Sequence, residues 1–157
     1  MENRIKAPEL IVEKWLNTDE NISLNSLKGK IVIFEAFQML CPGCVFHGMP
    51  LLKKIYEIFK NRDDIKIFAI HTVFEHHQSM TEEPLKTFLY EFGYDFPVGI
   101  DKHIDIKKDP IPETMKAYNL RGTPSLVIID KDGFIEKIFF GNVDELELGL
   151  LIGKLLN

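Results

Sequence analysis

The sequence predicts an α/β fold in which a central mixed β-sheet is flanked by helices. Residues 30–37 form a near-continuous apolar run, which is typical of a strand buried on both faces of a sheet. A helical segment and a second apolar run at residues 65–70 follow, an order that indicates two parallel strands joined by a right-handed crossover. Residues 125–129 and 134–140, separated by Asp130-Lys131-Asp132-Gly133, predict a β-hairpin that completes the sheet.

The N-terminal half of the chain extends this core. Ile11, Val12 and Trp15 indicate a short first strand, and residues 22–30 resemble a strand end followed by a turn. After the first central strand, residues 45–60 predict a helix, because apolar residues recur there at helical spacing. The polar residues 61–64 end this helix before the second central strand begins.

An insertion separates the second central strand from the hairpin. Residues 81–94 predict a helix with an apolar face, since Thr81-Glu82-Glu83-Pro84 is typical of a helix start. Residues 96–100 predict a short strand, and residues 112–118 predict a short helix. After the hairpin, residues 144–156 form an amphipathic segment that predicts a C-terminal helix.

Length and composition limit the number of domains and the classes of partner that can be expected. The chain has 157 residues, of which 45% are hydrophobic and 27% charged, and this suffices for one compact domain over residues 1–157. The net charge is −5 and no basic block occurs, so neither nucleic acid nor an anionic membrane surface is an expected partner. No apolar run resembles a signal peptide or a membrane span, so we expect a cytoplasmic protein; an exported form with its signal removed would read the same.

Cys41 and Cys44 are the only cysteines, and they lie between the first central strand and its helix in Leu40-Cys41-Pro42-Gly43-Cys44. Unpaired backbone N–H groups and the positive end of the helix dipole favour a thiolate at such a helix start. The spacing also lets the second sulfur form a disulfide with the first, so the pair predicts a dithiol redox centre. Two alternatives stay open: a metal site, although a structural zinc needs four ligands, and two inert core cysteines.

A later motif gives the chain a resemblance to a known family. A Cys-x-x-Cys after a strand, a crossover helix, and Thr123-Pro124 leading into a hairpin and a final helix resemble the thioredoxin-like superfamily over nearly the whole chain. The additional N-terminal strand, the insertion before Thr123-Pro124 and the segment Gly122-Thr123-Pro124-Ser125 are most similar to its TlpA/ResA and redoxin branch. The resemblance implies a thioredoxin-like fold with an N-terminal strand extension.

The resemblance also implies roles for particular residues. Pro124 is expected to be cis and to lie against the dithiol, so that the backbone of Thr123 pairs with an extended substrate next to Cys41, with Pro42 and Gly43 close by. Glu35, six residues before Cys41, matches the buried carboxylate of thioredoxins. Buried, its pKa would rise and it could take a proton from Cys44. The alternative is that Glu35 faces solvent or forms a salt bridge.

Some positions depart from the family pattern. Leu40 replaces the usual tryptophan before the first cysteine, and Phe37 is the aromatic residue four positions before that cysteine. Pro50 lies six residues after Cys44, where the TlpA branch usually has five. His47, three residues beyond Cys44, is a candidate proton carrier or thiolate partner, or a partly exposed helix residue. Arg121 is a candidate for stabilising a thiolate, or a member of a surface ion pair.

A histidine-rich segment follows the second central strand. His71, His76 and His77 begin at the strand end where open α/β sheets usually place their sites, so this segment could help to line the dithiol pocket. No carboxylate or thiol at a fixed spacing completes a ligand set with them, so we expect no metal. The expected redox group is the Cys41–Cys44 disulfide, with no other cofactor.

The sequence therefore predicts a thiol–disulfide oxidoreductase. Its expected partners are a disulfide- or thiol-containing protein substrate and an upstream thiol reductant. A peroxiredoxin-like thiol peroxidase is the first alternative, but Phe34 and Gln38 occupy the positions where that class resembles Pro-x-x-x-Thr-x-x-Cys counted from Cys41. A non-catalytic module that binds a metal through Cys41, Cys44 and His47 is the second.

Overall fold

The computed structural model describes residues 3–157 and contains one seven-stranded mixed sheet with the strand order β1-β7-β6-β3-β4-β5-β2. The strands are β1 (Ile5–Lys6), β2 (Val12–Leu16), β3 (Ile31–Phe37), β4 (Ile65–His71), β5 (Val98–Asp101), β6 (Ser125–Ile129) and β7 (Phe134–Phe140). The α-helices are α1 (Met49–Phe59), α2 (Glu82–Glu91), α3 (Glu113–Ala117) and α4 (Glu145–Leu156). Three short helices complete the chain: the 3₁₀-helices η1 (Asn25–Leu27) and η3 (His77–Ser79) and the π-helix η2 (Cys44–Gly48).

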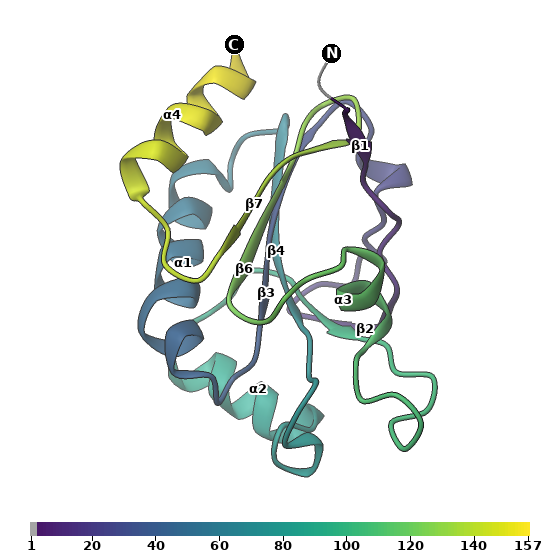
Figure 1. Cartoon of the computed structure of the whole chain (residues 1–157). Helices are drawn as coiled ribbons and strands as arrows, with labels where there is room; N and C mark the ends of the chain where they lie inside the picture. The colour runs from purple at the N-terminus through teal and green to yellow at the C-terminus, as the bar shows by residue number, and fades with distance from the viewer. Residues whose placement is uncertain (1–2) are drawn as a thin grey trace.

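The sheet separates two hydrophobic cores. Figure 1 shows α1 and α4 side by side on one face and α3 on the opposite face. Alternate residues of β3 belong to different cores: Ile31, Ile33 and Phe37 pack beneath the helices α1, α2 and α4, whereas Val32 and Phe34 pack with Tyr118 on the other side. This alternation is the period of two expected for a strand, and it assigns Glu35 to the face that α1 covers.

β3 lies at the centre of the sheet, as its apolar run predicts. It pairs in parallel with β4 and antiparallel with β6, and all seven of its residues are buried. The chain leaves β3 directly into the segment that carries the two cysteines, at the carboxyl ends of β3 and β4. Open α/β sheets usually place their sites at such an edge.

The prediction of a strand end at residues 22–30 is wrong, because a distant carboxylate organises this segment. The Glu9 side chain accepts hydrogen bonds from the backbone N–H groups of Leu24 at 2.7 Å and Asn25 at 3.1 Å. Because Glu9 accepts from these backbone N–H groups, the segment forms the 3₁₀-helix η1 rather than a strand. The two-residue strand β1 was not predicted either; it is held only by pairing with β7, which a short stretch of sequence does not reveal.

Two helices differ from their predicted bounds. α2 ends at Glu91, three residues before the expected end, and Gly93 follows in a left-handed conformation with φ of 69°. The helix after Cys44 begins as the π-helix η2, in which the Met49 N–H donates to the Cys44 carbonyl five residues earlier. A π-turn holds one residue more than an α-turn, so η2 accommodates the additional residue that separates Cys44 from Pro50.

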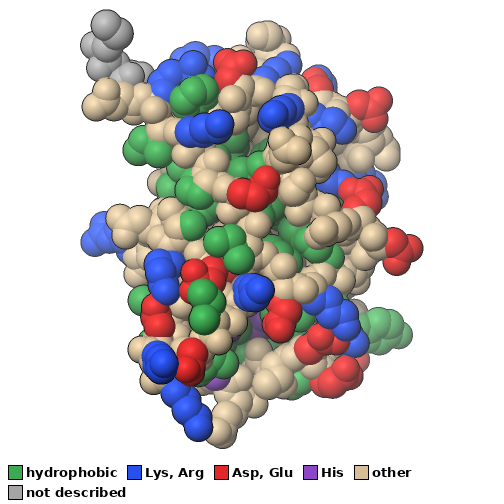
Figure 2. Space-filling view, turned by 90° about the vertical axis from the view of Figure 1, so that its right-hand side faces the viewer, with side chains coloured by type: hydrophobic (Ala, Val, Ile, Leu, Met, Phe, Trp, Pro, Cys, Tyr) green, Lys and Arg blue, Asp and Glu red, His purple; other side chains and the backbone are tan. Residues whose placement is uncertain are grey.

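The surface carries charges of both signs together with exposed apolar side chains. Figure 2 shows lysine and arginine interspersed with aspartate and glutamate over the face that it views. Ion pairs on the molecule include Lys14 with Glu82 at 2.8 Å and Arg62 with Asp64 at 2.8 Å. Within residues 3–157, no helix has both the length and the apolar character needed to cross a membrane.

Candidate active site

The two cysteines are free thiols with different surroundings. Cys41 is half-buried just before the helix, and Cys44 at the start of η2 is 0% exposed. Burial raises the pKa of the Cys44 thiol well above its ordinary value, and hydrogen bonding with Cys41 adds to the shift. The backbone N–H of Gln38 points at Cys44 Sγ, 3.5 Å away, and partly offsets this effect. Cys44 is therefore the protected sulfur of the pair, and Cys41 is the accessible one.

The segment Thr123-Pro124 lies against the dithiol. The Thr123–Pro124 peptide bond is cis, as the resemblance implies. The Cys41 thiol donates to the Thr123 carbonyl, with 3.6 Å between Sγ and the oxygen. The Pro124 ring packs so close to Gly43 that a Cβ on this glycine would lie 3.2 Å from Pro124 Cδ. The structure thus brings together the predicted residues of the Cys-x-x-Cys loop and the proline loop.

Glu35 is buried beneath the helix that carries the dithiol. Its side chain is 3% exposed and forms no ion pair or hydrogen bond with any described residue, so the alternative of a solvent-facing or salt-bridged Glu35 is wrong. Burial raises the pKa of Glu35 to about 8, and the nearby charge of Cys41 contributes. A carboxyl group with this pKa can hold or release a proton near neutral pH.

Gln38 is a site residue that the sequence analysis did not assign. It is buried, its Oε1 accepts from the Phe74 N–H at 3.2 Å, and its Nε2 donates to Thr123 Oγ1 at 3.5 Å. With its backbone N–H directed at Cys44, Gln38 joins three segments around the dithiol. The sequence could have indicated this role, because Gln38 is a long polar side chain three residues before Cys41 and directly follows the apolar residues Ala36 and Phe37.

His71 supports the same loop from below. Its ring is buried, packs against Phe37 with 4.9 Å between ring centroids, and accepts a hydrogen bond at Nε2 from the Met39 N–H at 3.1 Å. Burial lowers the pKa of His71 to about 3, so the ring stays neutral near pH 7. His71 therefore positions the approach to Cys41, and lies under the loop rather than beside the sulfurs.

The other histidines of that segment point elsewhere. His76 is exposed, and the His77 ring contacts the Pro110 carbonyl at 3.0 Å and packs near His103. Of the three histidines expected to help line the dithiol pocket, only His71 contributes to it, and it does so indirectly through the Met39 N–H in the loop before Cys41. Over residues 3–157, no three or more histidine, cysteine, aspartate or glutamate side chains are grouped so as to hold a metal ion.

The two auxiliary candidates lie at the margin of the site. His47 is exposed and lines a hollow between η2 and the segment Gly141–Val143, and it makes no hydrogen bond to either sulfur in the described chain. The Arg121 guanidinium lies 5.7 Å from the centre of the Phe140 ring and has no carboxylate partner within the described residues. Arg121 therefore does not form the ion pair considered for it.

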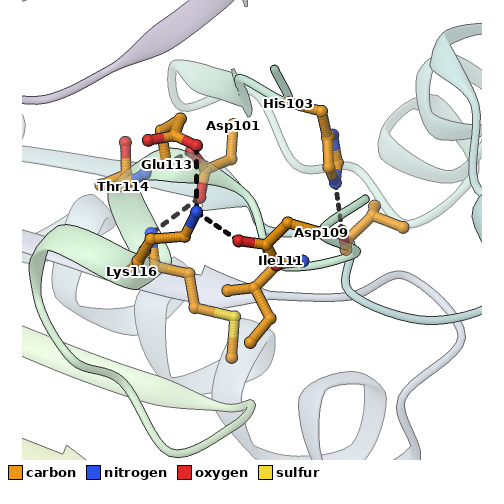
Figure 3. Close-up of polar contacts among 9 residues, drawn as sticks. Asp101, His103, Asp109, Ile111, Glu113, Thr114 and Lys116 are labelled. Carbon is orange, nitrogen blue, oxygen red and sulfur yellow. Dashed lines mark hydrogen bonds and ion pairs between the residues drawn. The ribbon is translucent and has the colours of Figure 1, made fainter. Parts of the chain in front are cut away.

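The insertion before the proline loop is anchored by one buried carboxylate. Asp101, at the end of β5, accepts hydrogen bonds from the N–H groups of Thr114 and Met115 and from the Thr72 hydroxyl. Figure 3 shows Asp101 next to Thr114 at the start of α3, with Lys116 joined to Glu113 and to Asp109 close by. Asp101 thereby ties α3, which leads to the proline loop, to the end of β4 behind the dithiol.

Comparison with known proteins agrees with this geometry. Residues 4–138 match the AhpC/TSA family. The chain belongs to this family. The chain is also similar to the thiol-disulfide oxidoreductase ResA of Bacillus cereus, to which it is 30% identical over 134 residues, covering 85% of this chain and 67% of the relative. ResA of Halalkalibacterium halodurans is 28% identical over 126 residues, and the chain spans 62% of the length of that relative.

Solved structures place this AhpC/TSA family member in the thioredoxin-like fold. A thioredoxin-like superfamily protein superposes with a TM-score of 0.92 at 48% identity, covering 98% of this chain and 97% of the other. A thiol-disulfide isomerase from Corynebacterium glutamicum superposes with a TM-score of 0.88 at 46% identity, covering 96% and 97%. The predicted fold and the predicted thioredoxin-like resemblance are both confirmed.

Proposed function

We propose that this protein is a thiol–disulfide oxidoreductase that uses Cys41 as the attacking sulfur and Cys44 as the resolving sulfur. The observation that carries the proposal is the asymmetry of the pair: Cys41 is accessible and faces the Thr123 carbonyl beside the cis proline, whereas Cys44 is buried behind it. The similarity to the ResA thiol-disulfide oxidoreductases and to the Corynebacterium thiol-disulfide isomerase supports the same chemistry.

The reaction consists of two exchanges of one disulfide bond. The Cys41 thiolate attacks a substrate disulfide, a Cys41–substrate bond forms, and one substrate sulfur leaves as a thiolate. Cys44 then loses its proton and attacks Cys41 Sγ, so that the Cys41–Cys44 disulfide forms and the second substrate sulfur leaves. The substrate gains two electrons and the dithiol loses two, so each turnover requires a thiol reductant to restore the pair.

Glu35 supplies the proton acceptor for the second exchange. The buried Cys44 holds its proton strongly, so it needs a base in order to attack. Glu35 lies on the face of β3 that α1 covers, and its pKa of about 8 suits it to accept a proton near neutral pH. No hydrogen bond joins Glu35 to either sulfur in the described structure, and we infer that the proton passes between them through an intervening water molecule.

The surroundings of Cys41 favour a polypeptide substrate. Leu40 before the thiol is 55% exposed, Phe46 in η2 is 72% exposed, and Phe140 beside Gly122 is 51% exposed. These three side chains belong to the segments that carry the dithiol and to the strand beside the proline loop, and we name them the apolar rim. They offer contacts that a small disulfide cannot use. Pro124 and Thr123 complete the surface next to the attacking sulfur, with Pro42 and Gly43 opposite them.

Parallel oxidation of one preparation of reduced protein tests the proposal against the peroxidase alternative. We expect catalytic reduction of insulin or a small disulfide, and loss of thiols to hydrogen peroxide no faster than for an ordinary reactive thiol. The buried Phe34 and Gln38 offer no threonine hydroxyl to activate a peroxide bond. Peroxide oxidation many orders of magnitude faster than a free thiol, with negligible disulfide exchange, would replace the oxidoreductase with a peroxidase.

A further inference from the structure

The helix that follows the dithiol changes its hydrogen-bond pattern within one turn. The Val45 N–H donates to the Cys41 carbonyl, four residues back, at 3.0 Å, whereas the Met49 N–H donates to the Cys44 carbonyl, five residues back. Turns of the second kind are rare and occur frequently at functional sites. The π-turn decides which residue of this helix faces the sheet next to the buried sulfur, and that residue is Gly48.

Space, and not backbone conformation, requires a glycine at position 48. Its φ of −62° and ψ of −53° are ordinary helical values that any residue adopts. A Cβ at this position would lie 2.3 Å from Glu35 Oε1 and 2.8 Å from Pro124 Cβ, both too close for real atoms. The backbone of Gly48 thus covers the Glu35 carboxyl group on its helix side.

Among the described residues, only packing contacts hold the Glu35 carboxyl group in place. No described side chain or backbone N–H donates to it, although it is buried. Its neighbours across the sheet are Ala69 and Leu126, whose side chains share its face, and Gly48 and Pro124 close it from above. Since no donor fixes the carboxyl group, the shape of this enclosure sets its position.

We propose that Gly48, presented to the sheet by the π-turn, is a positioning residue for Glu35 in the resolution of the mixed disulfide. The inference rests on the proposed function, in which the Cys44 proton passes to Glu35 as Cys44 bonds to Cys41 and the substrate thiolate leaves. A methyl group at position 48 displaces the carboxyl group from its place, so this step slows. The first attack by Cys41 needs no proton transfer to Glu35, so the substitution slows it less than it slows resolution, although the added methyl group also approaches Pro124.

A double-mutant cycle on single-turnover kinetics tests the proposal. Reduced wild type, Gly48→Ala, Glu35→Gln and the double variant are mixed with a model disulfide, and attack and resolution are followed as separate phases. We expect Gly48→Ala to slow resolution at least about tenfold and attack much less, and to add no further slowing of resolution in the Glu35→Gln background. Glutamine keeps the shape of the side chain, so the steric conflict remains while the proton acceptor is lost.

Gly149→Ala is the matched control, because position 149 lies in α4 and a Cβ there meets nothing within 4 Å. Equal slowing by Gly48→Ala in both backgrounds would overturn the proposal, since the substitution would then act on the helix rather than through Glu35. Normal resolution in Glu35→Gln would overturn it as well. Wild type without any disulfide exchange would instead remove the proposed function.

Glu35→Asp keeps the test decisive if Gly48→Ala does not fold. Aspartate is shorter by one methylene, so it withdraws from the 2.3 Å conflict and keeps a carboxyl group. We expect the Glu35→Asp background to restore folding of Gly48→Ala, or to reduce its kinetic effect where the single variant folds. Aspartate leaves the 2.8 Å conflict with Pro124 Cβ in place, so failure of aspartate to relieve either defect would show that Pro124, and not the carboxyl group, is what position 48 accommodates.

Discussion

Gln38 Nε2 lies 3.5 Å from Thr123 Oγ1, and this contact joins the loop before the dithiol to the loop of the cis proline. The same side chain accepts from the Phe74 N–H after β4. One buried amide therefore spans the three loops that surround Cys41 and Cys44. Its two polar ends are both used, so removing it leaves a backbone donor and a hydroxyl without their partner.

Gln38→Ala is expected to impair exchange more than it impairs folding. The loss of the contacts to Phe74 and Thr123 costs about 1–3 kcal/mol of stability, whereas misplacement of the loops by about 1 Å can slow the reaction up to about 100-fold. Disulfide-exchange kinetics and urea denaturation measure the two effects. Gln78→Ala, at an exposed position, is the control and should match wild type. Equal activity of the two variants would contradict a role of Gln38 in loop placement.

His71 is expected to make stability fall in acid. Its pKa of about 3 in the folded protein lies below the ordinary value of about 6.5, so the unfolded chain binds the proton first. Stability present above about pH 6.5 is therefore lost as the pH falls towards 3, by about 1.4 kcal/mol per pH unit from this residue. Denaturant midpoints of wild type and His71→Phe across this range measure the difference.

The phenylalanine variant also lacks the acceptor for the Met39 N–H. We expect it to be about 1–3 kcal/mol less stable than wild type at pH 7 and to show a shallower loss in acid. His76→Asn removes an exposed histidine, and asparagine tolerates the left-handed backbone at this position, so this variant should keep the acid slope of wild type. An unchanged slope in His71→Phe would show that His71 is not the buried neutral group.

Glu35 is expected to have the opposite effect at higher pH. Its pKa in the folded protein, about 8, lies above the unfolded value of about 4.3, so the folded state binds the proton more strongly. The stability that this provides is complete below about pH 4.3 and is lost as the pH rises through about 8. As the pH rises from 5 to 9, the free energy of unfolding of Glu35→Gln should therefore increase relative to that of wild type, by about a few kcal/mol.

The difference between the two denaturation profiles isolates Glu35, because wild type and Glu35→Gln share every other titrating side chain. A constant difference over this pH range would show that the carboxyl group titrates as an exposed glutamate does. That result would also remove the physical basis for proton exchange with Cys44.

The parts of the fold and site that could be predicted are those encoded within short stretches of sequence. The apolar run of β3, the Cys-x-x-Cys loop and Thr123-Pro124 are local patterns, and the structure has them where they were expected. The strands β2 to β7 of the sheet also follow from alternation and turns, whereas the edge strand β1 does not.

The features that could not be predicted depend on partners far away in the sequence. Gln38 acquires its role from Phe74 and Thr123, which are 36 and 85 residues distant. The turn at η1 depends on Glu9, and the sequence revealed the extra residue before Pro50 without showing that a π-turn absorbs it. The structural role of such residues depends on tertiary contacts, about which local sequence propensity carries little information.

Alkylation should distinguish the two cysteines. Cys41 is half-buried beside the proline loop, whereas Cys44 is 0% exposed and its pKa is raised by burial. We expect iodoacetamide to label Cys41 first in reduced protein at mildly acidic pH, as mapped by mass spectrometry, because the thiolate is the reacting form. Cys41→Ser should label slowly at Cys44 although this thiol is then the only one. Preferential labelling of Cys44 would reverse the proposed roles.

Substitutions in the apolar rim should separate protein substrates from small ones. Leu40→Ser, Phe46→Ser and Phe140→Ser remove exposed apolar surface around Cys41 without touching the sulfurs, so each should lower the rate of insulin reduction several-fold. Reduction of a small aromatic disulfide should stay within about twofold of wild type, since such a substrate reaches Cys41 without covering the rim. Ile58→Ser is the matched control, because Ile58 on α1 is 71% exposed and lies a full helix length from the dithiol. If both substrates slow equally, the rim shapes the site rather than the docking of a polypeptide, and the proposed substrate class is wrong.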